Sequence, residues 1–295
     1  IGMILYVALF GEAGLFPIWD AEREIAAAVA EREHFEEQAA AYEAATIVAD
    51  AAELYQRADL IVKIQPPTEA EIEQMKEGAV VVGMMLPHRF PQRIKKMRDR
   101  GILSFAMELV PRISRAQSMD VLSSQASVAG YKAALMAADR SGGFFPMLTT
   151  AAGTIRAAKV LVIGAGVAGL AAIGTAKSLG AIVRAFDTRP EVKDQILSMD
   201  AEFLELDFEE DGSGAGGYAK QMSKEFIEAE MALFAEQAQD VDIIITTALI
   251  PGKPAPKLIT ADMICTMKHG SVLVDLAAEQ GGNCELTVPH KVVER

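Results

Sequence analysis

Three glycines near the middle of the chain have the spacing of a dinucleotide-binding turn. Gly164, Gly166 and Gly169 form a G-x-G-x-x-G pattern that follows the apolar run 160–163 and precedes an Ala/Leu-rich helical stretch. In such a unit the first glycine permits the tight turn, the second lets the backbone approach a pyrophosphate, and the third lets helix and strand pack closely. The N–H groups at the helix start would bind the phosphates. The alternative is a tight turn that binds no ligand.

The residues around the turn extend this prediction. Asp187 ends the next predicted strand, 181–186, about where the motif places the acid that bonds the ribose. A carboxylate there would accept bonds from a 2′-hydroxyl and repel a 2′-phosphate, so the pattern predicts NAD(H) rather than NADP(H). The cation of nearby Arg189 would weaken that preference. The candidate cofactor-binding residues beside the glycines are Val167, Ala168, Asp187, Thr188 and Arg189.

A second polar segment, residues 111–125, carries two arginines, one acid and many hydroxyl or amide groups. It stands at the start of a long predicted helix, Ser118–Ala138, and could face a nucleotide cleft. The alternative is a capped helix start, with Ser114 or Ser118 as the N-cap. The residues alone leave both interpretations open.

The elements that must position these segments alternate between apolar runs and helical stretches, which is typical of an α/β fold with parallel sheets. We expect two Rossmann-like domains, separated by a cleft and joined by a long helix. The first α/β domain spans residues 1–125, the connecting helix 126–145, and the NAD-binding Rossmann domain 146–295. A doubly wound sheet usually has a sixth strand. None is clear before Arg295, so we expect this domain to lack its C-terminal end.

Several local features are predicted within this outline. Thr68 should cap a helix, and Gly130, inside the long Ser/Ala-rich helix, should let another backbone pack close. Met84 and Met85 are interpreted as core, and the four histidines as surface or turn residues. The expected strands lie at residues 58–64, 79–86, 102–105, 160–163, 181–186, 201–206, 241–246 and 271–275.

Composition narrows the classes of partner. The net charge of −13 argues against nucleic acid and anionic membrane surfaces. The two cysteines, Cys265 and Cys284, have no CxxC spacing, so neither a disulfide framework nor a metal site is expected. The apolar first ten residues are too short to span a bilayer and are interpreted as a buried strand.

Six segments in order resemble one family. They are RISRAQSMD, VIGAGVAGLAA, RAFDTRPEVK, GGYAKQMS, TTALIPGKPAP and VDLAAEQGGNCE. Together they are similar to the NAD(H)-binding component, domain I, of proton-translocating nicotinamide nucleotide transhydrogenase. The resemblance is dense from about Pro111 to Pro289, is looser between Tyr42 and Pro111, and lacks the family's Arg-rich early motif in the first forty residues.

The resemblance implies roles for individual residues. Arg112, Gln117 and Asp120 match a loop over the nicotinamide ring, and Ser123 the residue that bonds the carboxamide. Gln117 would also orient the ribose and touch the partner domain. Gly217 and Tyr218 match a mobile loop that folds over bound nucleotide. The wall beside the nucleotide would comprise Thr247, Ala248 and Leu249.

The resemblance also implies an activity: hydride transfer between NADH and NADP⁺, with NADP(H) held by a separate domain III and protons carried by a transmembrane domain II. The chain would then be a homodimeric, peripheral part of a membrane enzyme, on the cytoplasmic side of a bacterial inner membrane or the matrix side of a mitochondrial one.

Two alternatives stay open from the sequence. An alanine-dehydrogenase-like enzyme would need an acid–base pair near the ring. Leu86 takes the place of its histidine, His88 lies two residues away, and Glu279 replaces its aspartate. A nucleotide-sensing module without catalysis would share the glycine pattern but would not need the Arg-Gln-Asp loop.

Overall fold

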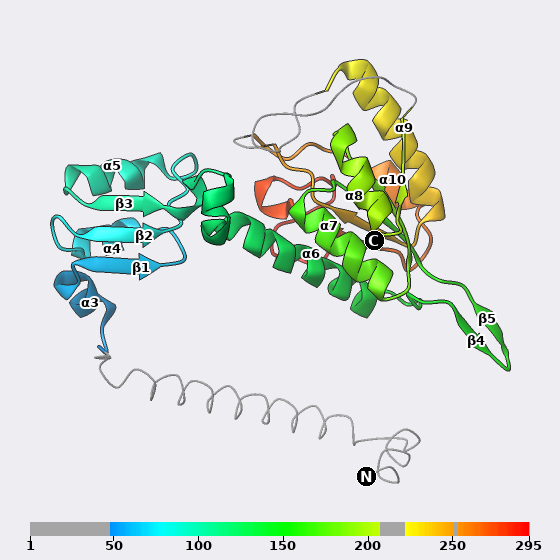
Figure 1. Ribbon diagram of the computed structural model, residues 1–295, viewed down its shortest axis with the longest axis horizontal. Coiled ribbons are helices and arrows are strands. Elements are labelled where there is room, and N and C mark those ends of the chain that lie inside the picture. The colour runs from blue at the N-terminus through cyan, green and yellow to red at the C-terminus, as the bar shows by residue number, and fades with distance from the viewer. Residues whose placement is uncertain (1–47, 207–221, 251–252, 295) are drawn as a thin grey trace, which may run out of the picture. The chain divides into compact units, whose positions relative to one another are not determined.

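The computed structural model describes residues 48–206, 222–250 and 253–294 (Figure 1). The chain divides into two compact units, one formed by residues 1–58 and 74–76 and the other by the rest. In the described part of the first unit, Asp50 caps helix α3 (Ala51–Arg57) through a 3.0 Å bond from the Ala52 N–H. The Lys76 N–H donates to the Tyr55 carbonyl at 3.1 Å.

The second unit contains two parallel sheets, and the first has three strands in sequential order: β1 (Leu60–Lys63), β2 (Val80–Gly83) and β3 (Leu103–Ala106). Helices α4 (Glu69–Gln74) and α5 (Pro91–Asp99) connect them. Thr68 and Glu71 form a capping box, because the Glu71 N–H donates to Thr68 Oγ1 at 3.2 Å and the Thr68 N–H to Glu71 Oε2 at 2.6 Å. The predicted cap at Thr68 is confirmed.

The second sheet has five parallel strands in the order β10-β9-β6-β7-β8. Read from β8, this is the order 3-2-1-4-5 of a doubly wound sheet, with its switch point between β6 and β9. Ile163 at the end of β6 pairs with Phe186 of β7 and Thr246 of β9, so three carboxyl ends meet at one edge. The strands are β6 (Lys159–Ile163), β7 (Ile182–Phe186), β8 (Glu202–Phe203), β9 (Ile243–Thr246) and β10 (Val272–Asp275).

Successive side chains of the central strands point to opposite faces of the sheet, and this produces two hydrophobic cores. Val160 and Val162 face one core, which also holds Ala133 and Ala172, whereas Leu161 and Ile163 face the other. The first face carries helices α6 (Val121–Arg140), α7 (Val167–Ser178) and α8 (Lys193–Ser198). The second carries α9 (Lys224–Asp240) and α10 (Ala261–Thr266) (Figure 1). The parallel sheets and their covering helices confirm the predicted α/β class. Because both faces of the five-stranded sheet are buried, its central strands appear in the sequence as continuous apolar runs.

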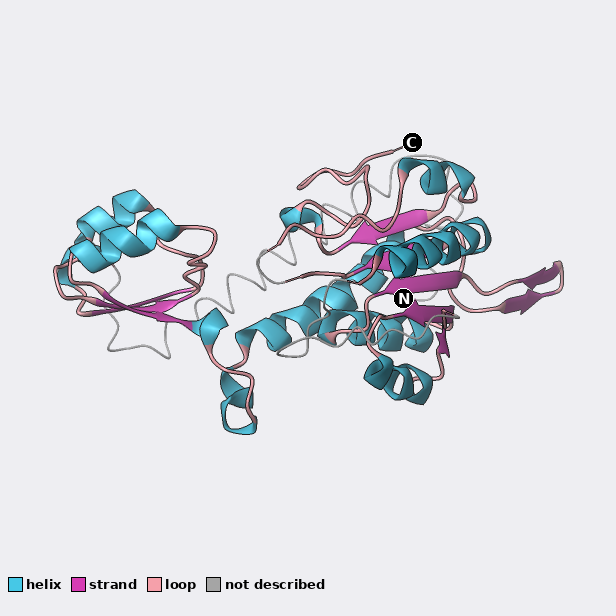
Figure 2. Cartoon of the chain, turned by 90° about the horizontal axis from the view of Figure 1, so that it is seen from above, coloured by secondary structure: helices cyan, strands magenta, loops and turns pink. Residues whose placement is uncertain are grey.

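Three local details differ from what the sequence predicts. The strand expected at 201–206 is only the two-residue β8, because it pairs with β7 alone at the sheet edge. The segment before the glycine turn, for which no strand was predicted, contains an antiparallel hairpin, β4 (Leu148–Thr150) and β5 (Gly153–Ile155), visible in Figure 2. The long helix is present as α6, but it begins at Val121 after the 3₁₀ turn η2 (Ser114–Met119), so neither Ser114 nor Ser118, the two alternatives for its N-cap, takes that position. Asp120, a strong capping residue, takes that position.

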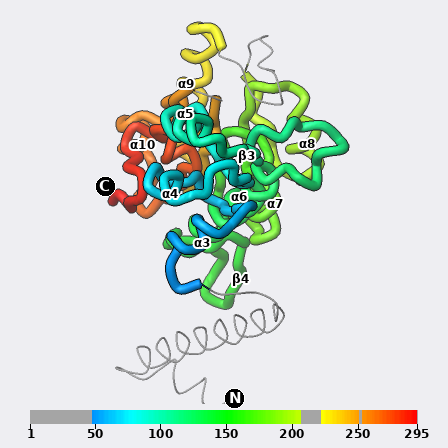
Figure 3. The backbone as a smooth tube through the Cα atoms, turned by 90° about the vertical axis from the view of Figure 1, so that its left-hand side faces the viewer, coloured from blue at the N-terminus to red at the C-terminus, as the bar shows by residue number. Residues whose placement is uncertain are grey.

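Helices α6 and α7 pack side by side (Figures 1 and 3), and a glycine permits this packing. A Cβ atom on Gly130 of α6 would lie 1.9 Å from the Ala168 carbonyl oxygen in the first turn of α7. Since that neighbour is backbone, it cannot move aside as a flexible side chain would. The prediction that Gly130 allows close backbone packing is confirmed, and it ties α6 to the start of α7.

We predict opposite effects for two helical glycines. Gly130→Ala should lower the free energy of unfolding by about 2–4 kcal/mol, because the methyl group must separate α6 from α7. Gly174→Ala in α7 is the matched control, since a Cβ there meets nothing within 4 Å. It should stabilise the protein by about 0.5–1 kcal/mol through helix propensity. Urea unfolding of both variants measures this, and equal effects would contradict the packing argument.

Candidate functional site

Each of the three glycines in the turn occupies its position for a different geometric reason. Gly164 has φ of +95°, which favours glycine, and a Cβ there would lie 2.7 Å from Thr247 Oγ1. A Cβ on Gly169 would lie 1.8 Å from the Gly164 carbonyl oxygen, whereas one on Gly166 would enter open space. The first and third glycines are therefore needed for packing, and the second leaves the backbone accessible to a ligand.

The start of α7 is suited to receive an anion. Gly166 is its N-cap and supplies no side-chain bond. The N–H groups of the first helical turn, which begins with Val167 and Ala168, have no partner within the helix, and the macrodipole adds partial positive charge there. This arrangement fits the phosphates of a dinucleotide.

Asp187, at the end of β7, is held by the turn itself. Its Oδ2 accepts bonds from the Ala165 N–H at 2.7 Å and from Arg189 Nη2 at 2.8 Å. Its Oδ1 accepts from the N–H and Nε of Arg189, both at 2.9 Å. The two side chains are 6% and 11% exposed, and bonding to Asp187 raises the pKa of Arg189.

This network changes the expected role of Asp187. A carboxylate has about four acceptor positions, and here four donor groups occupy them. A ribose hydroxyl would therefore have to share or displace a bond to Arg189. The adjacent Thr188 offers a buried hydroxyl that lacks a hydrogen-bond partner in the described structure. The ribose assignment of these residues stays a prediction.

The segment after β9 lies against the turn. Thr247 Oγ1 donates to the Gly164 carbonyl at 3.1 Å, and a Cβ on Gly164 would lie 3.4 Å from the Ala248 nitrogen. Asn283 bonds the backbone of Ala248 on both sides. Leu249 follows and is partly buried. Thr247 and Ala248 therefore lie beside the glycines, which is where residues that form a wall beside the nucleotide would have to be.

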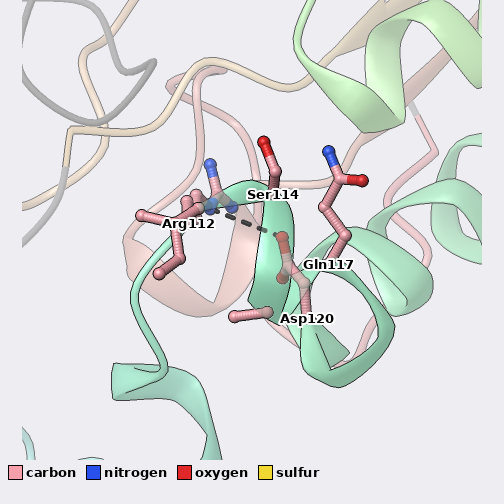
Figure 4. Close-up of a pocket in the computed structure, with 6 residues that line it drawn as sticks. Arg112, Ser114, Gln117 and Asp120 are labelled. Atoms are coloured by element: carbon pink, nitrogen blue, oxygen red, sulfur yellow. Dashed lines mark ion pairs between the residues drawn. The ribbon is translucent and has the colours of Figure 1, made fainter.

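The polar segment before α6 surrounds a cavity of about 380 Å³, shown in Figure 4. Arg112 Nε lies 3.8 Å from Asp120 Oδ2, and the Gln117 side chain points away from this ion pair. The lining residues are Arg112, Ile113, Ser114, Ala116, Gln117 and Asp120. Three of the four residues expected over a nicotinamide ring therefore share one pocket.

Asp120 also begins helix α6. Its Oδ1 accepts a bond from the Ser123 N–H at 2.9 Å, and its Oδ2 accepts one from Ser123 Oγ at 2.7 Å. These bonds, and then the charge of Arg112, hold the pKa of Asp120 below its usual range. Asp120 is ten residues before Gly130, which is about 15 Å along a helix. The cap, the pocket and the start of α7 are thus joined by one rigid element.

Sequence reasoning missed Asn283 and Arg189 as structural determinants of this site. Asn283 stood out only as a member of a family motif, although it is the one asparagine in the chain. Arg189 was named as a cofactor-binding residue and as a cation that would weaken the preference for NAD(H), but its pairing with Asp187 was not predicted. Gly217 and Tyr218 lie outside the described residues.

The positions relevant to an alanine dehydrogenase carry no acid–base pair. Leu86 has φ of +46°, and its N–H donates to Glu108 Oε1 at 2.6 Å. His88 is exposed and lies in a turn, as predicted, and the Glu279 side chain is 68% exposed. His269 and His290 are exposed, as predicted, and His34 is outside the described residues. Met85 is buried, as predicted, whereas Met84 is only partly buried.

The part of the chain that is described holds neither a candidate metal cluster nor a membrane-spanning helix. It contains no group of three or more His, Cys, Asp or Glu side chains placed to hold a metal ion. None of its helices combines the length and apolarity needed to cross a membrane.

Comparison with known proteins places the chain among a defined set of relatives. The family model "Alanine dehydrogenase/PNT, N-terminal domain" matches residues 27–129, and "Alanine dehydrogenase/PNT, C-terminal domain" matches residues 133–295. NAD(P) transhydrogenase subunit alpha of Haemophilus influenzae is 58% identical over 259 residues, covering 88% of this chain and 50% of the relative. The chain thus spans about half the length of that relative.

Two further relatives extend the comparison. NAD(P) transhydrogenase subunit alpha of Cereibacter sphaeroides is 52% identical over 261 residues, which are 88% of this chain and 50% of the relative. The crystal structure of transhydrogenase from Sinorhizobium meliloti superposes with a TM-score of 0.73 at 47% identity, covering 84% of this chain and 67% of that one.

A buried carboxyl on α9 makes the stability of the folded protein depend on pH. Glu230 is 6% exposed, and burial together with the charge of Asp187 raises its pKa to about 7. An acid whose folded-state pKa is raised binds its proton more tightly in the folded state. Its contribution to stability is present below the unfolded pKa near 4.5 and is lost as pH rises through about 7.

We therefore predict that Glu230→Gln raises the free energy of unfolding relative to wild type by up to about 3 kcal/mol near pH 8, with the difference disappearing near pH 4.5. Urea unfolding across this range measures it. Glu228→Gln, an exposed position on the same helix, is the control and should show no such trend. A pH-independent difference at Glu230 would contradict the prediction.

Proposed function

Because the chain belongs to the alanine dehydrogenase/PNT family, we propose that it is the NAD(H)-binding component of a proton-translocating transhydrogenase. One observation carries the proposal: an accessible glycine turn and a polar pocket are joined through α6, whose Gly130 packs on the first turn of α7. The turn suits the pyrophosphate, and the pocket suits the nicotinamide end of the same nucleotide. The similarity to transhydrogenase alpha subunits supports this choice within the family.

The proposed roles follow from the side chains. Gly164, Gly166 and Gly169, with the N–H groups of Val167 and Ala168, hold the phosphates. Asp187, Thr188 and Arg189 face the adenosine ribose, and Thr247, Ala248 and Leu249 form the wall. Arg112, Gln117, Asp120 and Ser123 position the nicotinamide, and Gly217 and Tyr218 close over it.

The chemistry assigned to this chain is positioning. Direct hydride transfer between NADH and NADP⁺ needs two nicotinamide rings held near contact with water excluded, and it needs no general acid or nucleophile. The ion pair of Arg112 with Asp120 and the capping bonds to Ser123 leave the amide of Gln117 to orient the nucleotide. NADP(H) would be bound by a separate domain III.

The remaining assignments belong to the same proposal. The chain acts as a homodimer and as the peripheral part of a membrane enzyme whose transmembrane domain II carries protons. It lies on the cytoplasmic side of a bacterial inner membrane or on the matrix side of a mitochondrial one. Within it, residues 1–125 form the first domain, 126–145 the connecting helix and 146–295 the NAD-binding domain.

An amino-acid dehydrogenase is the second candidate, and the family includes alanine dehydrogenases. It is less well supported because Leu86 cannot transfer a proton and Glu279 is exposed. A nucleotide sensor would not need the polar pocket before α6. Turnover of NADH with pyruvate and ammonia by this chain alone would favour the dehydrogenase over our proposal.

We predict that this chain binds NADH more tightly than NADPH by about tenfold or more, because a 2′-phosphate would meet the Asp187 carboxylate. Arg189→Ala should widen the ratio, since it removes the cation that could attract the phosphate. Titration monitored by nucleotide fluorescence measures both affinities. Equal affinity of the wild type for the two nucleotides would contradict the assignment.

We further predict that Gln117→Asn lowers the rate of hydride transfer to a domain III partner while leaving NADH affinity nearly unchanged. The shorter side chain would misplace the ring, and a displacement of about 1 Å can cost on the order of 100-fold in rate. Gln125→Asn, an exposed position on α6, is the matched control. Full transfer activity of the Gln117 variant in stopped-flow measurements would exclude this role.

A further inference from the structure

We infer that Asn283 is a positioning residue for nucleotide binding, which acts by fixing the backbone of Ala248 against the glycine turn. The inference rests on the proposed function and adds to it a residue from outside the turn, the wall and the polar pocket. Asn283 is the one asparagine of the chain, and it is fully buried at 0% exposure.

The side-chain amide of Asn283 is fully engaged. Its Oδ1 accepts a bond from the Ala248 N–H at 3.0 Å, and its Nδ2 donates to the Ala248 carbonyl at 2.8 Å. The same Nδ2 donates to the Pro256 carbonyl at 2.9 Å. Asn283 thus bonds the Ala248 backbone as a neighbouring strand would. Through its bond to the Pro256 carbonyl, it also fixes the other end of the segment 248–256.

Asn283 is in turn fixed to the end of β10. Asp275 Oδ2 accepts bonds from the Asn283 N–H at 2.8 Å and from Thr287 Oγ1 at 2.6 Å. Gly282, which precedes Asn283, has φ of +79°, and a Cβ there would lie 2.7 Å from Asp275 Oδ2. The amide therefore has one well-defined position relative to the sheet.

The clamp reaches the glycine turn through Thr247 and Ala248. Thr247 Oγ1 bonds the Gly164 carbonyl, and a Cβ on Gly164 would lie 3.4 Å from the Ala248 nitrogen, so the Ala248 backbone lies beside the turn. Loss of the Asn283 bonds would let the Ala248 backbone shift toward or away from the turn. The space for the nucleotide would change, although none of the glycines had been altered.

The sharpest test is Asn283→Asp, which keeps the side-chain shape. One carboxylate oxygen can still accept from the Ala248 N–H, but the other faces the carbonyls of Ala248 and Pro256 and repels both. Burial and these carbonyls raise the pKa of the introduced carboxyl, so protonation near neutral pH restores one donor. Relative to wild type at the same pH, NADH affinity should be about tenfold lower near pH 8.5 and should recover near pH 6.

Thr260→Ala separates positioning from stability. Thr260 caps α10 by accepting a bond from the Met263 N–H at 3.2 Å, so its loss should lower Tm without changing NADH affinity. A variant that merely weakened the fold would behave like this control and would not regain affinity on acidification. Recovery of NADH affinity on acidification therefore indicates that binding depends on a hydrogen-bond donor directed at the carbonyls of Ala248 and Pro256.

The outcomes are distinct. If the wild type binds no NADH, the proposed function fails and this inference with it. If the wild type binds and Asn283→Asp binds equally well near pH 8.5, the inference alone is overturned. If the variant does not fold, hydrogen exchange on the nucleotide-free wild type decides: the Ala248 amide should be protected, and exchange at the unprotected rate would overturn the clamp.

Discussion

Close approach of backbone to backbone around the glycine turn is the constraint on which the described structure depends. Gly169 lets α7 contact the carbonyl of Gly164, and Gly130 lets α6 contact the carbonyl of Ala168. Strand β6, helix α7 and helix α6 are therefore stacked through positions where even a methyl group would clash. Because the polar pocket lies just before α6, its location relative to the turn is fixed by the same contacts.

The fold could be predicted from the sequence where burial dictates residue type. The runs at 160–163 and 243–245 are wholly apolar because both faces of their sheet are covered. Thr68 and Glu71 have the spacing of a capping box, which is a local signal. The edge strand β8 and the β4–β5 hairpin were not predicted correctly, since short edge elements bury too little surface to require an apolar pattern.

The candidate site could be predicted as a set of residues but not as a set of bonds. Asp187 and Arg189 were both named, yet their pairing depends on the turn of the chain after β7. Asn283 is 35 residues from Ala248 in sequence, and only the folded sheet brings β9 and β10 together. Asp120 was named only as a nicotinamide residue, and the alternative of a capped helix start named Ser114 or Ser118, whereas Asp120 is the N-cap of α6.

Two arginines of the candidate site each lie against a carboxylate, and this pairing of opposite charges affects which chemistry the site can perform. Arg189 is bonded to Asp187, and Arg112 lies against Asp120. A proton-transfer enzyme needs an acid or base that can change its charge during the reaction, whereas Asp120 is held ionised by its capping bonds. The uncharged groups at the site include the Gln117 amide, the Thr247 hydroxyl and backbone N–H groups. Such groups orient a nucleotide without exchanging protons with it, which favours hydride transfer between two nucleotides over dehydrogenation of an amino acid.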